Sequence, residues 1–352
     1  MSLRLRLSVL AVVSAAVLLS GGALRAQALP FLLFERYLDP LRIQAGIPGL
    51  SAVILQDNQV VWERGFGYRD VEASHAATPD TPYAIADLTQ TITATLLLHC
   101  TERGVVDLSA PLRDWLPDAE SSHTTLRQLL THAAPAGALG YRYTPSRFAL
   151  LARPVETCFD GPFRHVVAQN VFELLSMRDA VPGYDILTAP DAVREHFDDA
   201  TLARYAALLE RVATPYRVDN RGRATRGDLP PVAVDGAHGL IASARDLAKF
   251  DQGLPIHLRA ESLQRAWTNA THNGVPTPFG LGWFVQNYNG EKLVWHYGHF
   301  PEAFSSLILK VPGRRLTLIL LANSDGLSGP FSLSQGDVTS SLFARTFLRL
   351  FL

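Results

Sequence analysis

Hydrophobic residues recur at the three- and four-residue spacing of a helix in several separate stretches of the chain. This periodicity predicts helices over residues 31–45, 126–131, 145–155, 163–177, 200–213, 244–251 and 338–352. Ser243 directly precedes one of them and is a typical helix cap. A further helix is expected within residues 83–104, which begin with a polar turn and continue as an apolar rod. We expect the rest of the chain to be arranged around this helix.

Strand-like runs lie near both ends of the chain. Residues 50–55 and 60–66 are joined at Asp57 and Asn58 and predict a β-hairpin. Further strands are predicted over residues 279–285, 292–296, 304–311 and 316–322. Strands at both ends with helices between them indicate an α+β fold, in which one antiparallel sheet built from both termini is flanked by helices. An α/β part would comprise about 29–86 and 236–352, and an inserted helical part about 87–235.

The N-terminus has the features of a secretory signal peptide. Arg4 and Arg6 precede an apolar run over residues 7–20, and Ala26-Gln27-Ala28 follows as an A-x-A exit. We therefore expect a signal peptide over residues 1–28 and a secreted or periplasmic mature chain over residues 29–352. The run is short for a membrane span, so no stable span is expected after cleavage. An uncleaved anchor helix is the alternative interpretation.

The composition argues against a nucleic-acid partner and leaves the state of the two cysteines open. The chain has 352 residues, 47% of them hydrophobic, and a formal net charge of -1. No overall field therefore favours nucleic acid. Export would permit a disulfide between Cys100 and Cys158, whereas their apolar helical surroundings favour two buried free thiols. Metal-ligand spacing is absent from the sequence, and no metal or other cofactor is expected.

Several short motifs, in this order and at these spacings, resemble the serine β-lactamase and penicillin-binding-protein-like family, in the branch of class C β-lactamases, D,D-peptidases and esterases. The matching stretches are 47–51, 62–68, 78–83, 126–132, 148–151, 175–179, 243–250, 280–284 and 304–306. The resemblance covers nearly the whole mature chain. It implies a β-lactamase/transpeptidase-like fold with a crevice between the sheet and the helical part.

The family's S-x-x-K motif corresponds here to Asp87 and Gln90. In the family the Ser attacks a carbonyl and the Lys one turn later takes its proton. A carboxylate attacking an acyl carbon gives only a labile anhydride, and a neutral amide cannot act as a base. Asp followed three residues later by Gln also resembles a helix capping box, which explains both residues without chemistry.

The family's Y-x-N motif corresponds to Tyr143 and Pro145, so the Tyr is kept and the Asn is lost. Thr144 and Pro145 are typical of a helix cap and a first helical residue. Tyr143 and Pro145 are nevertheless the positions that the resemblance places at the crevice.

The family's K-T-G or H-x-G motif corresponds to His296, Tyr297 and Gly298, followed by His299. A glycine there permits close approach of a substrate backbone, and His296 is expected to donate to a ligand. The resemblance thus implies a binding edge at Tyr297, Gly298 and His299. A metal site formed by His296, His299 and Asp87 is not expected, because no spacing demands it.

Two functional hypotheses follow. The first is an exported pseudoenzyme, without the Ser nucleophile and Lys base, that binds a small-molecule, peptide or peptidoglycan ligand in the former active-site crevice. The second is a hydrolase of esterase, β-lactamase or peptidase type that acts through Asp87 with Tyr143 or His296. The pseudoenzyme predicts an Asp87 carboxylate that is spent on backbone N–H groups. The hydrolase predicts a carboxylate with a raised pKa that faces an open crevice.

Overall fold

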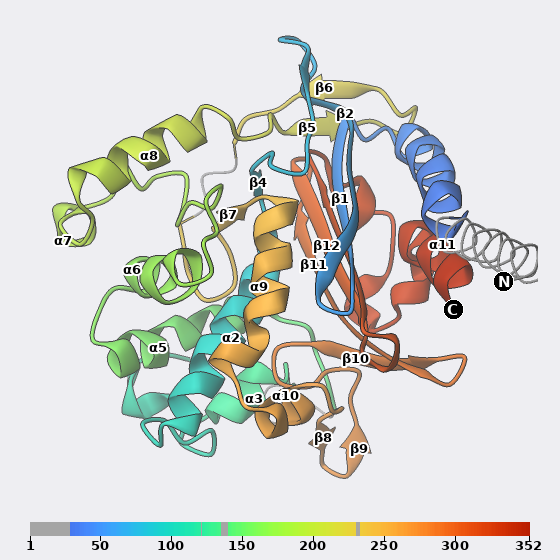
Figure 1. Ribbon diagram of the computed structural model, residues 1–352. Coiled ribbons are helices and arrows are strands. Elements are labelled where there is room, and N and C mark those ends of the chain that lie inside the picture. Colours follow the sequence, from blue (N-terminus) through green and yellow to red (C-terminus); the bar gives the residue numbers. More distant parts are fainter. Residues whose placement is uncertain (1–28, 121, 135–139, 230–232) are drawn as a thin grey trace, which may run out of the picture.

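The computed structural model describes residues 29–120, 122–134, 140–229 and 233–352. The predicted signal peptide lies outside the described residues. The central feature is a seven-stranded sheet in the order β10-β11-β12-β13-β1-β2-β3 (Figure 1). Its strands are β1 Gly49–Gln56, β2 Gln59–Asp70, β3 His75–Ala76, β10 Phe284–Tyr288, β11 Glu291–Phe300, β12 Phe304–Val311 and β13 Leu316–Ala322. All neighbouring strands are antiparallel, and β13 pairs with β1, so both ends of the chain build the sheet as predicted.

The turn between β1 and β2 follows from two residues that tolerate a left-handed backbone. Asp57 and Asn58 have φ angles of 52° and 62°. Positive φ at both central residues is the geometry of a tight two-residue hairpin turn. The structure confirms the predicted hairpin and extends its second strand.

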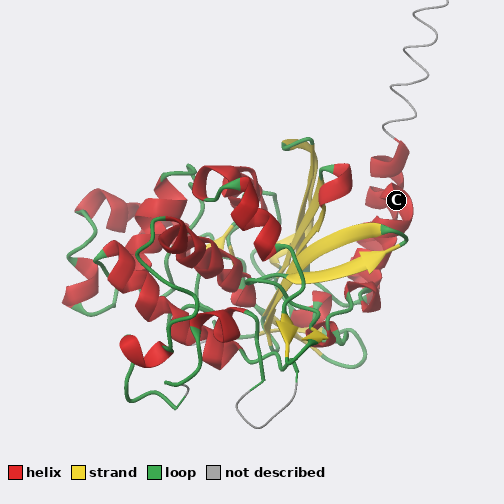
Figure 2. Cartoon of the chain, turned by 90° about the horizontal axis from the view of Figure 1, so that it is seen from below, coloured by secondary structure: helices red, strands yellow, loops and turns green. Residues whose placement is uncertain are grey.

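Helices cover both faces of the sheet (Figures 1 and 2). A helix over residues 29–44 and α11 (Leu342–Phe351) lie on one face. The central helix α2 (Thr89–Glu102) and α9 (Ala244–His257) lie on the other. The remaining helices are α3 Leu126–Leu130, α4 Pro145–Phe148, α5 Ala152–Phe159, α6 Phe163–Val167, α7 Asp191–Arg194, α8 Asp199–Leu209 and α10 Ala260–Ala266.

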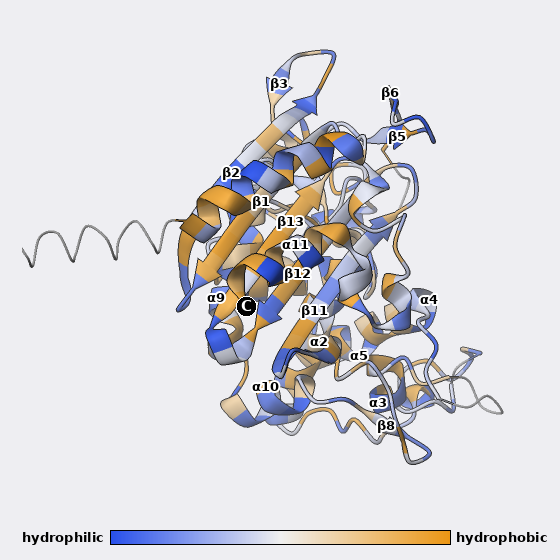
Figure 3. Cartoon of the chain, turned by 90° about the vertical axis from the view of Figure 1, so that its right-hand side faces the viewer, coloured by the Kyte–Doolittle hydropathy of each residue, from blue (hydrophilic) through white to orange (hydrophobic). Residues whose placement is uncertain are grey.

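Alternate residues of the central strands enter two separate cores. On β1, Ala52 and Ile54 pack with the terminal helices, whereas Val53 and Leu55 pack with the helical part. A strand buried on both faces is apolar at most of its positions. The central strands β1, β12 and β13 accordingly are mainly hydrophobic (Figure 3). This burial explains why the sequence shows continuous apolar runs there.

Smaller elements differ from the predictions in their bounds. The helix predicted over residues 163–177 consists of α6 and a π-helical turn, Ala168–Glu173. The polar stretch after Tyr216 forms a short hairpin from β5 (Tyr216–Val218) and β6 (Ala224–Arg226). Two further short pairs are β4 (Tyr83–Ala84) with β7 (Ile241–Ala242), and β8 (Thr271–His272) with β9 (Val275–Pro276).

Helix α2 is buried on nearly all sides, as its apolar composition predicts. Its polar residues are mainly threonines, which are costly to bury unless their hydroxyls have partners. Thr91, Thr93 and Thr95 donate to backbone carbonyls of the preceding turn. The helix thereby satisfies these polar side chains internally and can lie between the sheet and the helical part.

Cys100 on α2 and Cys158 on α5 form a disulfide. The expectation that both residues are free thiols is therefore wrong. The apolar surroundings that suggested free thiols instead describe two helices packed closely enough to be cross-linked. No helix among the described residues has the length and apolarity needed to cross a membrane.

Candidate functional site around Asp87

Asp87 lies in a tight turn between a strand and the central helix. The chain leaves β4, forms a 3-10 turn over Ala86–Leu88 and continues directly into α2. Ala86 has a φ of 50°, a strained conformation for a residue with a side chain. Gly298 on β11 faces this turn, and a Cβ there would overlap the Ile85 carbonyl oxygen and the Ser306 hydroxyl. The absence of a side chain at Gly298 therefore allows β11 to pack closely against Ile85 and Ser306.

The capping-box interpretation of Asp87 and Gln90 is wrong. Neither the 3-10 turn nor α2 has a side-chain cap, and the residues at the two cap positions are Ile85 and Leu88. Asp87 lies inside the turn, because the 3-10 segment starts one residue before it. Its carboxylate is therefore directed to partners on other elements.

The Asp87 carboxylate is closed in by three donors. One oxygen accepts the backbone N–H of His299 at 3.0 Å. The other lies 3.2 Å from Nε2 of His238 and accepts the Gln90 amide at 3.4 Å. The residue is only 4% exposed. A backbone N–H beside the nucleophile position could bind the oxyanion of a reacting carbonyl. Here that N–H is already bound by a carboxylate.

His238 supplies the positive charge that balances Asp87. Burial lowers the pKa of His238, but hydrogen bonds to Asp235 and Asp87 and the charges of both carboxylates outweigh it and raise the pKa to about 10. The imidazole is therefore protonated at neutral pH. Its Nδ1 lies 3.6 Å from Asp235, whose carboxylate also accepts the N–H groups of residues 237 and 238. Asp235, His238 and Asp87 thus form a charged row.

Gln90 connects the charged row to a second set of contacts, with Tyr143 and His132. Its amide nitrogen donates to Asp87 and to the Tyr143 hydroxyl, the latter at 3.0 Å. The Thr144 N–H donates to Nδ1 of His132, so Nε2 of His132 carries the proton and donates to the Gln90 oxygen at 2.9 Å. Burial, followed by the charges of His296 and Arg147, lowers the pKa of His132 well below its usual range. The ring is therefore neutral, and the Gln90 amide is saturated.

The two other expected proton carriers are poorly suited to the task. Burial and the charge of Asp87 raise the Tyr143 pKa well above its usual range, so the side chain remains a phenol. Burial lowers the pKa of His296 to about 4, which makes the ring neutral. Its Nδ1 donates to the Tyr297 carbonyl at 2.8 Å, and its buried Nε2 has no partner among the described residues. The predicted donor is therefore an acceptor.

The predicted ligand-binding residues differ in accessibility: Tyr297 is buried, whereas Pro145 and His299 are half-buried. Tyr297 is 7% exposed and packs with Phe284 and Trp295. Pro145 is the first residue of α4, as expected from Thr144-Pro145, although Thr144 makes no side-chain cap. Pro145, His299, Tyr143 and His238 are half-buried and form the accessible part of the site. A ligand-binding role for Tyr297, Gly298, His299 and Pro145 stays a prediction.

Sequence reasoning missed His132 and Asp235 and gave His238 no role. His132 ends the stretch 126–132, which carried the resemblance without a chemical assignment, and Asp235 precedes His238 by three residues. That Asp-x-x-His spacing was the available signal. Within the described ranges, no group of three or more His, Cys, Asp or Glu residues is arranged to hold a metal ion.

A sheet built from both termini, with a strand–turn–helix at Asp87 and β11 beside it, defines a β-lactamase and penicillin-binding-protein-like serine hydrolase fold. The sequence profile described as Beta-lactamase matches residues 34–333. The chain therefore belongs to the Beta-lactamase family.

Solved structures show the same fold at low sequence identity. An octameric penicillin-binding protein homologue from Pyrococcus abyssi has a TM-score of 0.70 and 21% identity, covering 90% of this chain and 76% of that one. A class C beta lactamase has a TM-score of 0.70 and 16% identity, covering 92% and 98%. A D-alanine carboxypeptidase from Burkholderia cenocepacia has a TM-score of 0.66 and 18% identity, covering 90% and 97%.

Curated relatives are also distant. Protein flp of Staphylococcus aureus (strain MW2) is 24% identical over 307 residues, which are 79% of this chain and 60% of that protein. The human mitochondrial serine beta-lactamase-like protein LACTB is 29% identical over 99 residues, 26% of this chain and 18% of that protein. The chain thus spans about 60% of the length of the first of these relatives and less of the second.

Proposed function

We propose that this protein is an exported pseudoenzyme of the Beta-lactamase family, which binds a peptide or peptidoglycan fragment at the mouth of the former active-site crevice. The observation that carries the proposal is the Asp87 carboxylate, bound by the His299 N–H and the His238 imidazolium at the position of the family nucleophile. Removal of a single nucleophile or base typically costs several orders of magnitude in rate. Here both positions have changed.

The surroundings of Asp87 support this proposal over a changed hydrolytic route. A carboxylate that activates water needs a free lone pair facing solvent, and Asp87 is 4% exposed with both oxygens engaged. Tyr143 is a half-buried phenol whose pKa is raised, and it is therefore a poor acid. His296 is neutral, and its one N–H is spent on the Tyr297 carbonyl. In the alternative mechanism, Tyr143 would therefore hold its proton too tightly to release it, and the only N–H of His296 is already engaged.

Export is supported by the N-terminal sequence and by the disulfide. Intracellular thiols are normally kept reduced, so a disulfide between Cys100 and Cys158 fits an oxidising compartment. The basic residues, apolar run and A-x-A exit before residue 29 fit the same destination. Cell fractionation with an antibody to the mature chain tests this directly. Recovery of the protein only in the cytoplasm would contradict export.

The catalytic part of the proposal is tested with the purified mature chain and three substrates. These are a chromogenic cephalosporin, short-chain esters and a labelled penicillin. We expect no turnover above the buffer rate and no covalent labelling. Turnover that Asp87→Ala abolishes would refute the pseudoenzyme, because it would assign the chemistry to the carboxylate. Covalent penicillin labelling would show that another residue is the nucleophile.

The binding part needs a separate measurement. Peptidoglycan-derived peptides are titrated into the wild-type protein and into Pro145→Ala and His238→Gln variants, with calorimetry as the readout. We expect weaker binding in both variants, because both residues are half-buried at the accessible part of the site. An exposed substitution elsewhere, Arg349→Gln, is the control. Equal affinity in all four proteins would place the ligand away from the crevice and refute the binding proposal.

A further inference from the structure

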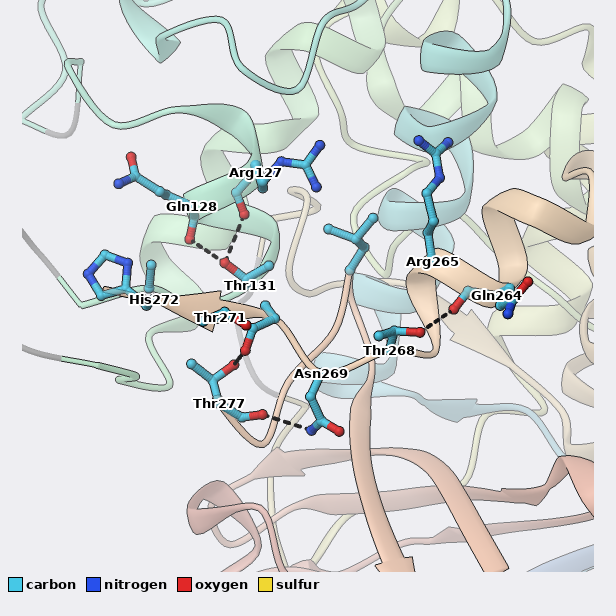
Figure 4. A pocket seen from close by; sticks show the side chains of 13 residues that line it. Arg127, Gln128, Thr131, Gln264, Arg265, Thr268, Asn269, Thr271, His272 and Thr277 are labelled. Atoms are coloured by element: carbon cyan, nitrogen blue, oxygen red, sulfur yellow. Dashed lines mark hydrogen bonds between the residues drawn. The ribbon is translucent and has the colours of Figure 1, made fainter. Parts of the chain in front are cut away.

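A hollow in the surface lies outside the site described above. It has a volume of about 470 Å³ and is bounded by α3, α10 and the β8–β9 hairpin (Figure 4). Its lining includes Arg127, Gln128, Thr131, Arg265, Thr268 and His272, and no residue of the Asp87 site. A hollow of this volume is within the range of small-molecule sites.

The charge of this hollow differs from that of the whole protein. The chain has a net charge of -1, yet the described residues that line the hollow include two arginines and no Asp or Glu. In the part of the chain that the structure describes, neither Arg127 nor Arg265 forms an ion pair. The nearby Asp107 does not neutralise Arg127. The pKa of Asp107 is lowered mainly by hydrogen bonds from Ser109, and the charge of Arg127 contributes least. The positive charge is therefore left for a ligand.

The hydrogen-bonding groups of the lining favour an anion. The Thr131 and Thr268 hydroxyls donate to carbonyls of their own helices, at 2.9 Å and 2.7 Å. The Gln128 oxygen accepts the Thr125 N–H at 2.9 Å, so the amide NH2 is the group left to bind a ligand. Arg265 donates one N–H to the Ser262 hydroxyl at 3.3 Å, and the other N–H groups of the two guanidinium groups are the strongest remaining donors. Guanidinium groups match the planar geometry of carboxylate and phosphate.

The two arginines come from different elements, and the lining also includes an aliphatic residue. Arg127 lies on α3 and Arg265 on α10, with Leu281 also in the lining. In Figure 4 the Arg127 guanidinium extends toward the side of the hollow on which the Arg265 side chain stands. A ligand between them would meet positive charge and an aliphatic surface together.

We propose that this hollow binds a small anionic molecule with a carboxylate or phosphate group and an apolar body. The oxyanion lies against Arg127 and Arg265, and the apolar part lies against Leu281. The lining of this hollow contains no residue of the Asp87 network. Its ligand can therefore differ from that of the former active-site crevice.

Calorimetric titration of the full mature chain tests the proposal with two probes, phenyl phosphate and phthalate, at constant ionic strength set with chloride. The two probes separate phosphate from carboxylate recognition. In the double variant Arg127→Gln, Arg265→Gln, we expect the dissociation constant of the preferred probe to rise at least about tenfold, since charge-assisted bonds are lost. The control Arg36→Gln, Arg178→Gln removes two exposed arginines elsewhere and should leave binding unchanged.

The variants are expected to fold, because Arg127 and Arg265 are exposed, and circular dichroism checks this. Equal affinity in wild-type, double-variant and control proteins would overturn the proposal. So would the absence of binding of both probes at about 10 mM, since a weaker site would carry little specificity. An Asp87→Asn variant should bind the two probes as tightly as the wild type does. If the anion-site proposal fails, the pseudoenzyme proposal is therefore unaffected.

Discussion

Replacement of Asp87 by Asn removes one carboxylate from the charged row and keeps the shape of the side chain. The amide oxygen can still accept the His299 N–H, so the hydrogen bond observed at 3.0 Å is retained. What is lost is the negative charge 3.2 Å from His238. The pKa of His238 should therefore fall from about 10 toward its usual value of 6.5.

The size of the effect follows from the raised pKa. An increase from 6.5 to about 10 corresponds to about 5 kcal/mol between the imidazolium and its surroundings, at about 1.4 kcal/mol per pH unit. Asp87 and Asp235 both contribute, so Asp87→Asn should cost about 2.5 kcal/mol of unfolding free energy near pH 6. This stabilisation is fully present below pH 6.5, because His238 is then charged in both the folded and unfolded chain. It is lost as the pH rises through 10.

Urea unfolding of the wild-type and variant proteins at intervals between pH 6 and pH 10 measures this difference. The wild-type stability should fall more steeply with pH than that of Asp87→Asn, so the two curves converge at high pH. The control Asp191→Asn breaks an ion pair whose carboxylate side chain is 89% exposed, and should follow the wild-type curve. Parallel curves for the wild type and Asp87→Asn would refute the charged row.

Three other predictions concern the scaffold, and urea unfolding of each variant measures them. Replacing Cys100 and Cys158 by Ala should cost about 4 kcal/mol, because the disulfide closes a loop with a sequence separation of 58 residues; an unchanged midpoint would contradict the bond. Gly298→Ala should cost about 3 kcal/mol because its Cβ would overlap a backbone carbonyl, and stability equal to wild type would refute that packing. Lys310→Met should lower the free energy of unfolding by about 4 kcal/mol, because it leaves the buried Asp251 without its cation. Adding Asp251→Leu should restore most of that stability. A double variant as unstable as Lys310→Met would contradict the ion pair.

The sheet and its helices could be predicted because the apolar pattern is unambiguous in these parts of the chain. The runs 304–311 and 316–322 coincide with β12 and β13, since strands buried on both faces are apolar at most of their positions. The hairpin at Asp57 and Asn58 follows from local turn chemistry. The disulfide could not be predicted, because an apolar helical environment is the same for a free thiol and for a cross-linked one. Only the packing of α2 against α5 distinguishes them.

The site was only partly predictable, because its partners come from distant parts of the chain. Resemblance placed Asp87, Gln90 and Tyr143 near one another, and the Gln90 amide does contact both other side chains. The spacing of Asp87 and Gln90 also fits a capping box, and the sequence alone could not show that the carboxylate faces β11. The partners His132 and His238 lie 42 and 151 residues from Gln90 and Asp87. No local pattern reports contacts of that range.

The contacts also indicate why reintroducing the family's Ser and Lys would not by itself restore acyl transfer. Asp87→Ser would leave the His238 imidazolium with Asp235 alone. Gln90→Lys would place an ammonium opposite the Nε2–H of His132, where the Gln90 oxygen now accepts, and the Thr144 N–H holds that tautomer in place. Two donors would then face each other in a buried site, which is costly. Recovery of acyl transfer in the double variant Asp87→Ser, Gln90→Lys should therefore require a change at His132, and full activity without it would refute this reading of the network.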